Sequence, residues 1–248
     1  MSLLNNVATD SSIQDETDSV GGGGVLESGL YPMKVTMAYL EKSAGGALAV
    51  SLHLEGVNGG QTRQKLWVAS GDAKGNKNYY ETQQGEKRYL PGFNNANALC
   101  LLTVGKELGQ MTTEEKLVKI YSFDAGAEVP TKVEVLTDLI GQEILTGLQK
   151  QIVDKRVKAD DGSYQPTGET REENEIDKFF RASDRMTTAE IRAEATEAAF
   201  AETWENKWTG NTRDRSSKGG TGQTGAPSTP AANAPAAGKK PTASLFGS

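Results

Sequence analysis

The sequence predicts a mainly β fold, in which about five strands form a small antiparallel barrel with one or two helices. Several segments alternate apolar and polar residues with a period of two, as strands with one buried face do. Glycine-containing turn sequences separate the first of these segments. Two later stretches have a helical period instead. The two ends of the chain contain few large apolar residues, so we expect disordered tails.

The first two strands form a predicted hairpin. Residues 31–39 alternate, "SAGG" supplies a turn, and residues 48–54 alternate again. His53, the only histidine, falls on the polar face of the second strand, where we expect it to be solvated rather than catalytic. The two predicted faces of the first strand are Tyr31, Met33, Val35, Met37 and Tyr39 on one side and Lys34, Thr36 and Ala38 on the other.

The middle of the chain combines strands with a helix. A third strand is predicted at 63–70, after the turn sequence "VNGG". Residues 94–108 have helical spacing, which makes Cys100, the only cysteine, a half-buried helical residue rather than a reactive thiol. Thr112 and Glu115 have the spacing of a capping box, so we expect a helix to start there. Further strands are predicted at 133–135 and 144–157.

A last helix is predicted from Thr187, which forms a second capping box with Glu190, to near Gly210. The acidic segment before it, "TGETREENEIDKFF", is expected to be solvated or to pack rather than to bind a ligand. These elements make an oligonucleotide-binding (OB) fold the leading candidate among small barrels. The apolar stripe of the last helix is expected to dock on the sheet and consists of Ala189, Ala193, Phe200 and Trp204.

The chain divides into three predicted parts. Residues 1–29 are a flexible acidic arm without lysine or arginine, residues 30–208 are the folded domain, and residues 209–248 are a disordered basic tail rich in Gly, Pro and Ala. The tail ends in "SLFGS", which contains Leu245 and Phe246. Two interpretations of this end stay open: a terminus without a role, or a short peptide that docks on a replication, recombination or transcription protein.

Composition excludes several classes of protein. A net charge of −6 excludes a protein that coats nucleic acid by its overall charge, so any polyanion site has to be a local patch. One cysteine and one histidine make neither an intrachain disulfide nor a Cys/His zinc site, and we expect no metal and no cofactor. No apolar run approaches the roughly 20 residues of a membrane span, so no membrane partner is expected.

The stretch 63–93, "RQKLWVASGDAKGNKNYYETQQGEKRYLPGF", combines cations with aromatic rings. It contains six basic and three acidic residues, a net charge of +3, together with five rings. Alternation along its first strand points Leu66 and Val68 inward and Trp67 outward, on the same face as two cations. The candidate binding residues are Arg63, Lys65, Trp67, Lys74, Lys77, Tyr79, Tyr80, Lys87, Arg88, Tyr89 and Phe93.

These residue types indicate a non-catalytic site for single-stranded nucleic acid with little sequence preference. Cations neutralise phosphates, and each ring stacked on a base contributes roughly 1–3 kcal/mol. Stacking requires unpaired bases, so a single strand is favoured over a duplex. A second basic group on the predicted strand 144–157 is a candidate for the other wall of a groove: Lys150, Lys155 and Arg156.

Five stretches carry a family resemblance: "SGLYPMKVTMAYLEKSAGGALAVSLHLEG", "RQKLWV", "KRYLPGF", "DLIGQEILTGLQKQIVDKRV" and "TGETREENEIDKFF". Over roughly residues 28–181 the chain resembles the single-stranded-DNA-binding proteins of tailed, especially short-tailed, bacteriophages. The resemblance implies an OB-type barrel that coats unpaired DNA in replication and recombination, without catalysis, in the cytoplasm of a bacterial host. One feature departs from the family: many members end in an acidic tail, whereas here the tail is basic and the N-terminal arm is acidic.

Two other functions stay open. A nuclease or recombination enzyme acting on single-stranded DNA would need carboxylates to hold metal ions, but none of the available ones belongs to a recognisable nuclease motif. A phage regulator that acts mainly through contacts with replication or transcription proteins is the second alternative. The carboxylates available to a nuclease are Asp154, Asp160, Asp161, Glu172 and Glu173.

Overall fold

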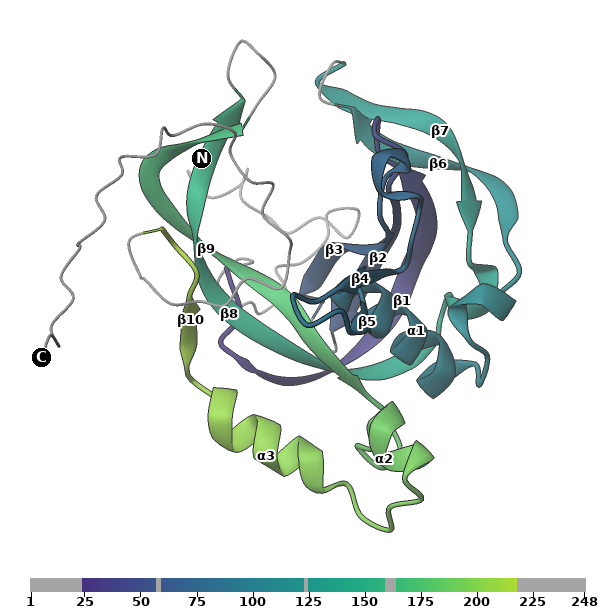
Figure 1. Cartoon of the computed structure of the whole chain (residues 1–248), viewed down its shortest axis with the longest axis vertical. Coiled ribbons are helices and arrows are strands. Elements are labelled where there is room, and N and C mark those ends of the chain that lie inside the picture. The colour runs from purple at the N-terminus through teal and green to yellow at the C-terminus, as the bar shows by residue number, and fades with distance from the viewer. Residues whose placement is uncertain (1–23, 57–58, 123–124, 159–163, 218–248) are drawn as a thin grey trace, which may run out of the picture.

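The computed structural model confirms the mainly β fold (Figure 1). It describes residues 24–56, 59–122, 125–158 and 164–217. Most of the acidic arm, Asp160, Asp161, Leu245 and Phe246 therefore lie outside the described residues. The strands are β1 (Gly29–Lys42), β2 (Leu48–Gly56), β3 (Gln61–Ala69), β4 (Tyr79–Glu81), β5 (Lys87–Tyr89), β6 (Glu114–Ser122), β7 (Ala127–Val135), β8 (Glu143–Lys158), β9 (Tyr164–Phe180) and β10 (Thr212–Asp214). The helices are α1 (Pro91–Thr103), α2 (Thr188–Arg192) and α3 (Ala199–Trp208).

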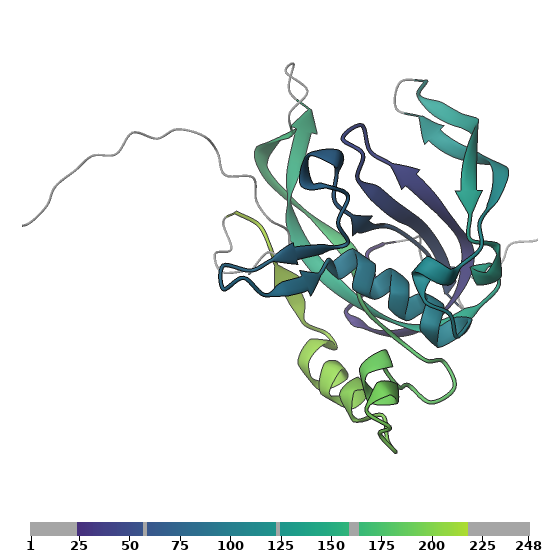
Figure 2. The same cartoon turned by 45° about the vertical axis from the view of Figure 1, so that its right-hand side comes forward.

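One curved sheet contains all of these strands except the β4–β5 hairpin (Figures 1 and 2). Its main path runs β9-β8-β1-β2-β3 with antiparallel pairing; β7 adds to β1, β6 adds to β7, and β10 adds to β8 in parallel. Backbone pairing among the described strands does not close the path into a full barrel. A side chain links its two ends instead, because Gln64 Oε1 accepts a hydrogen bond from the Ile176 N–H at 2.6 Å.

The first hairpin forms as predicted, but the two faces of β1 exchange halfway along it. The register with β2 shifts between Val35 and Met37, and such an irregularity reverses the alternation beyond it. Ala38 therefore lies in the core, whereas Tyr39 is buried on the opposite face, where its ring meets the edge of the His53 ring at a centroid distance of 5.8 Å. His53 is half-buried rather than solvated, and burial lowers its pKa.

Helix α1 confirms the predicted helix with shifted ends, since it begins at Pro91 and ends at Thr103. Gly92 lies directly against β3: a Cβ at this position would be 2.4 Å from the Trp67 carbonyl oxygen. This approach presses the apolar side of the helix onto the sheet. Cys100 is fully buried in the core rather than half-buried, and burial raises the pKa of its thiol to about 12.

Substitution of Gly92 by alanine is expected to lower the free energy of unfolding by about 1–3 kcal/mol, because the new methyl group would overlap the backbone of β3. Urea unfolding measures the change. Gly109→Ala is the matched control, since a Cβ at Gly109 meets nothing within 4 Å. Equal stability of the two variants would show that the helix does not need this close approach.

The predicted helix start at Thr112 and Glu115 is wrong. Residues from Glu114 onward form β6, which pairs with β7 along nine residues in an unbroken register. Long-range pairing with β7 outweighs the local capping signal, and β-branched residues such as Val118 and Ile120 suit a strand. The predicted strand at 133–135 is the end of β7, and that at 144–157 is β8.

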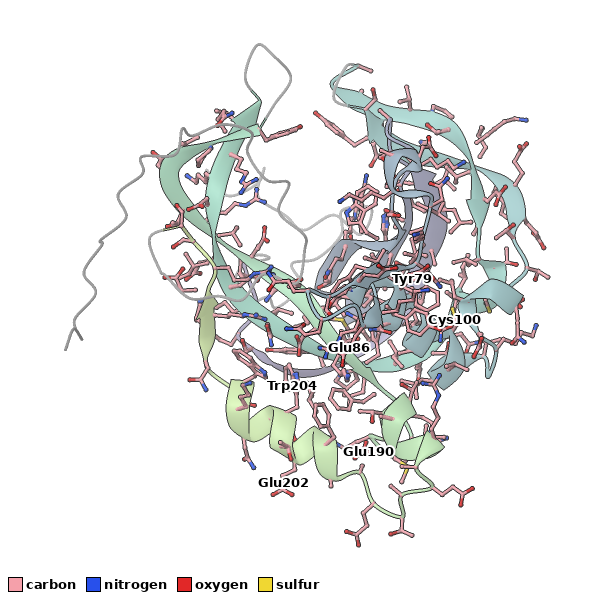
Figure 3. The ribbon with its side chains drawn as sticks, in the orientation of Figure 1. Tyr79, Glu86, Cys100, Glu190, Glu202 and Trp204 are labelled. Carbon is pink, nitrogen blue, oxygen red and sulfur yellow. The ribbon has the colours of Figure 1, made fainter. Side chains whose placement is uncertain are left out.

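The capping box at Thr187 is confirmed: its hydroxyl accepts from the Glu190 N–H at 3.2 Å, and the Glu190 carboxylate accepts from the Thr187 N–H at 2.8 Å. The helix that it starts is short, because Glu194 adopts a positive φ of 53° and a new helix, α3, follows. Trp204 docks on the sheet as predicted (Figure 3). Phe200, in contrast, stays 40% exposed. No helix among the described residues is long and apolar enough to cross a membrane.

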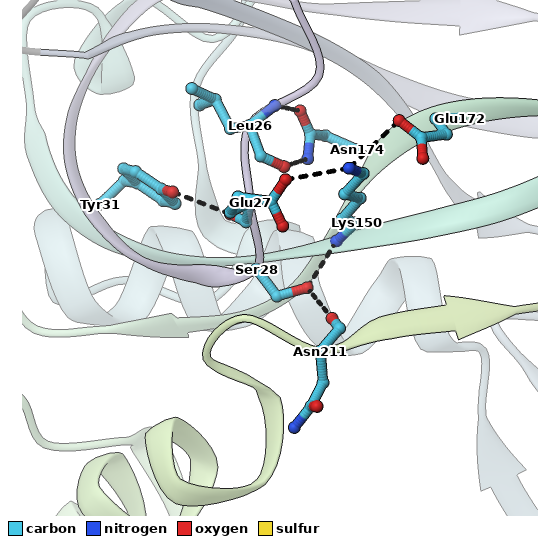
Figure 4. Close-up of polar contacts among 8 residues, drawn as sticks. All are labelled: Leu26, Glu27, Ser28, Tyr31, Lys150, Glu172, Asn174 and Asn211. Carbon is cyan, nitrogen blue, oxygen red and sulfur yellow. Dashed lines mark hydrogen bonds and ion pairs between the residues drawn. The ribbon is translucent and has the colours of Figure 1, made fainter.

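The folded domain extends beyond the predicted limits of 30 and 208. Ser28 is buried; its hydroxyl donates to the Asn211 carbonyl at 2.6 Å and accepts from the Lys150 N–H at 2.8 Å (Figure 4). The Asn174 side chain pairs with both backbone groups of Leu26, at 2.8 Å each. These contacts hold the two segments together at β8, which explains why residues beyond both predicted limits belong to the fold.

Candidate nucleic-acid interface

A long groove lies between β3 and the strands β8, β9 and β10. It consists of two adjoining cavities of about 930 and 540 Å³, which share Gln64, Lys65, Glu175 and Arg215 in their walls. The β3 side, with β4 and the start of α1, is called the near wall here, and the side formed by β8, β9 and β10 is called the far wall. The gap in backbone pairing between β3 and β9 is the reason that a groove exists at this place.

The near wall carries three of the five aromatic rings that the sequence predicts. Leu66 and Val68 are buried while Trp67 is 45% exposed and lines the larger cavity, so the predicted alternation along β3 is confirmed. Tyr79 and Tyr80 enter the same cavity from β4 and are half-buried. Three rings of the stretch 63–93 therefore face one space.

The loop between β3 and β4 is ordered by its own hydrogen bonds. The Ser70 N–H donates to the Lys77 carbonyl at 2.8 Å, and the Lys77 N–H donates to the Ser70 hydroxyl at 2.9 Å. The Asp72 N–H also donates to Gly45 in the first hairpin, at 2.9 Å. These bonds fix the loop that brings Lys74 and Lys77 to the larger cavity.

Cations lie beside the rings on the near wall. Lys77 Nζ lies 5.6 Å from the centre of the Tyr79 ring, within the range of a cation–π contact. Lys65 lines both cavities and pairs with Glu41 at 2.5 Å, and Arg63 lines the smaller one. Of the eleven predicted residues in 63–93, seven line the groove: Arg63, Lys65, Trp67, Lys74, Lys77, Tyr79 and Tyr80.

The other four predicted residues of this stretch lie outside the groove. Lys87 Nζ sits 5.1 Å from the Tyr79 ring centre, so it borders the site without lining it. Arg88 pairs with Glu86 at 2.8 Å. Tyr89 and Phe93 stack on each other with centroids 4.9 Å apart and a tilt of 31°. Lys87, Arg88 and Tyr89 belong to β5, in a hairpin with β4 that the sequence did not predict, and Phe93 belongs to α1.

The far wall is only partly the one predicted, since Arg156 lines the groove and the two lysines do not. Lys150 pairs with Glu27 at 2.9 Å and with Glu172 at 3.2 Å, and these hydrogen bonds raise its pKa (Figure 4). Lys155 pairs with Glu169 at 2.9 Å. Both lysines therefore form ion pairs within the protein. The carboxylates come from β9 and from the N-terminal segment, which lie next to β8.

Three arginines that the sequence analysis missed complete the far wall: Arg171, Arg213 and Arg215. Arg213 Nη1 donates to Gln149 Oε1 at 3.3 Å, and Arg215 Nη1 donates to Glu175 at 2.6 Å and to Gln151 at 3.3 Å. The prediction of a disordered tail from residue 209 is therefore wrong up to residue 217. Arg213 and Arg215 are two residues apart in "TRDRS", so in a strand they point to the same side, and this spacing was an available signal for a short strand.

Of the five acidic residues in the groove, Glu173 and Glu175 pair with a cation, whereas Asp154 and Asp177 accept only from neutral donors and Glu81 forms no ion pair among the described residues. Arg171 pairs with Glu173 at 2.8 Å, Asp154 accepts from Ser217, and Asp177 accepts from Trp204 Nε1 at 2.7 Å. Five of the cations, in contrast, form no ion pair among the described residues: Arg63, Lys74, Lys77, Arg156 and Arg213. The free positive charge thus outweighs the free negative charge in the groove.

The alternative of a metal-dependent nuclease gains no support from the arrangement of carboxylates. Within the described parts of the chain, no three His, Cys, Asp or Glu side chains are placed together so that they could hold a metal ion. Glu172 and Glu173 each pair with a cation instead.

Neither a protein-family model nor a curated protein sequence matches the chain.

Proposed function

We propose that the groove binds single-stranded DNA with little sequence preference and without catalysis. The observation that carries the proposal is that the exposed ring of Trp67 lines the same cavity as cations that have no carboxylate partner. A nucleic-acid strand carries bases and phosphates side by side, and a wall that combines rings with cations is complementary to both.

Stacking is the first contribution. Tyr79 and Tyr80 stand beside Trp67 around one cavity of about 930 Å³, and each ring offers a face that any base can cover. A base within a duplex has both faces covered by its neighbours, so the rings favour an unpaired strand. The choice of DNA over RNA comes from the family resemblance, since rings and cations act on both.

Phosphate binding is the second contribution. Arg63 and Arg156 line one end of the groove, and Arg213 lines the far wall of the other end, so a strand lying along the groove passes cations on both sides. Each neutralised phosphate releases condensed counterions into solution. Five phosphates held by the five unpaired cations would make the logarithm of the binding constant fall with the logarithm of salt concentration with a slope of about −3.5.

Fluorescence titration tests the proposal directly. Of the three tryptophans, Trp204 is buried and Trp67 is 45% exposed in the groove, so oligo-dT should quench the emission of Trp67. We expect quenching by the single strand, weaker binding at higher salt, and little response to a duplex of the same length. Trp67→Tyr is the control, because it keeps a stacking ring and removes the signal. Equal affinity for the single strand and the duplex would contradict the proposal.

A further inference from the structure

The hairpin of β6 and β7 is an exposed two-stranded ribbon at the side of the molecule away from β9 and β10 (Figures 1 and 2). Among the described residues, its backbone pairs with the rest of the sheet at Val135, opposite Tyr39, and the adjoining Leu136 N–H donates to the Ala38 carbonyl. Leu117, in the middle of β6, is 67% exposed, more than any other large apolar side chain in the described part of the chain. A two-stranded ribbon on its own is marginally stable in water, so an additional strand would stabilise it.

The two outer edges of this ribbon differ in their capacity to pair. β7 contains Pro130, which lacks an N–H group and blocks the addition of a further strand. β6 contains no proline, no glycine and no bulge, and among the described strands it pairs only with β7. Along residues 114–120 the outer edge of β6 therefore offers the N–H and C=O groups of alternate residues to a partner strand.

We propose that β6 pairs antiparallel with β6 of a second copy of this chain, about a two-fold axis at Leu117. A two-fold axis perpendicular to the sheet leaves each face of one ribbon continuous with the same face of the other. Directly opposite residues of the two copies therefore point to the same side. In this register Leu117 meets its own symmetry mate, and Glu115 of each copy lies opposite Lys119 of the other. The contact thus contains two Glu115–Lys119 pairs, and opposite charges directly across from each other stabilise neighbouring strands.

Charge selects this register among the possible ones. An axis at Lys116 or at Lys119 would place that lysine opposite its own symmetry mate, which is unfavourable. An axis at Val118 would place Leu117 opposite Lys119 and form no charge pair. The chain reads Glu115, Lys116, Leu117, Val118, Lys119, so in the register at Leu117 the complementary charges lie two residues on either side of the axis.

The charges needed for the contact are accessible. Lys119 is exposed and has no ion pair among the described residues. Glu115 pairs with Lys132 of β7 at 2.7 Å, but both side chains are more than 60% exposed, and an exposed pair of this kind contributes little to stability. Glu115 can therefore lie between Lys132 and Lys119 of the second copy without losing its present contact.

The proposed contact leaves the groove open in both copies, since neither β6 nor β7 contributes a residue to its walls. The dimer would extend the ribbon to four strands, in the order β7-β6-β6-β7. The proposal does not depend on the proposed function, because it rests on a different edge of the sheet.

Sedimentation equilibrium of the full chain tests the proposal. At concentrations up to about 100 µM, the wild type is expected to have the mass of two chains of 26.5 kDa. Lys119→Glu alone and Glu115→Lys alone each create two like-charge pairs and should be monomeric. An equimolar mixture of these two variants should form a dimer again, since every pair in the mixed dimer joins opposite charges.

Glu128→Lys is the matched control: it reverses an exposed charge on β7, away from the proposed contact, and should leave the dimer intact. Circular dichroism checks that all variants are folded. A wild type that is monomeric at every concentration overturns the proposal, as do single variants that remain dimeric. A mixture that stays monomeric while the wild type is dimeric overturns the register at Leu117.

Discussion

Replacing Trp67 and Tyr80 together by alanine is expected to weaken the binding of oligo-dT at least about thirtyfold. Each ring that stacks on a base contributes roughly 1–3 kcal/mol, and 1.4 kcal/mol corresponds to a factor of ten in affinity. Both rings line the larger cavity, and Trp67 is 45% exposed, so their removal takes away the stacking surface but little of the core. Fluorescence anisotropy of labelled oligo-dT measures the affinity.

Tyr164→Ala is the control for this double variant, because Tyr164 is 63% exposed on β9 and lies outside the groove. Its affinity should equal that of the wild type. Unchanged circular-dichroism spectra would show that the fold is intact in both proteins. Wild-type affinity in the double variant would falsify the assignment of this wall as a stacking surface.

The parts of the fold that sequence reasoning predicted depend on local patterns. Alternation and turn residues predicted the first hairpin and β3, and the capping box at Thr187 predicted the start of α2. The irregularity near Met37 was not predictable, because nothing in a period-two pattern marks the residue at which pairing slips. The start of β6 was mistaken because a capping sequence is only a local signal, and a distant strand outweighed it.

The residues of the candidate site also fall into two groups: those that local alternation predicts and those that depend on long-range strand pairing. Trp67 faces outward because its neighbours Leu66 and Val68 are buried, and alternation was sufficient to predict that. The far wall depends instead on which strands meet: Arg213 and Arg215 reach the groove only because β10 pairs with β8. Lys150 and Lys155 looked available in the sequence, but long-range pairing supplies each of them with a carboxylate. Most of the near wall was therefore predictable, whereas Arg156 was the one predicted residue that lines the far wall.

Substitution of Trp204 by alanine is expected to lower the free energy of unfolding by about 3–5 kcal/mol, the range for truncation of a large buried aromatic residue. Trp204 is 3% exposed, lies in a second core with Leu145, Phe180 and Ala201, and meets the Phe180 ring edge-on at 6.3 Å (Figure 3). Its indole also fills the space above Gly147, where a Cβ would be 3.0 Å from the ring. Urea unfolding monitored by circular dichroism measures the loss.

Trp204→Phe separates the hydrogen bond from the packing, since it keeps an aromatic ring and removes the Nε1–H that donates to Asp177 at 2.7 Å. It should cost less than the alanine variant, about 1–3 kcal/mol for leaving the Asp177 carboxylate without this donor. Because α3 leads directly into β10 and only the alanine variant loses the packing of the ring, this variant should also bind oligo-dT more weakly than the phenylalanine variant. Equal stability of the two variants would mean that packing of the ring adds nothing, and equal affinity for oligo-dT would mean that α3 does not hold the far wall in place.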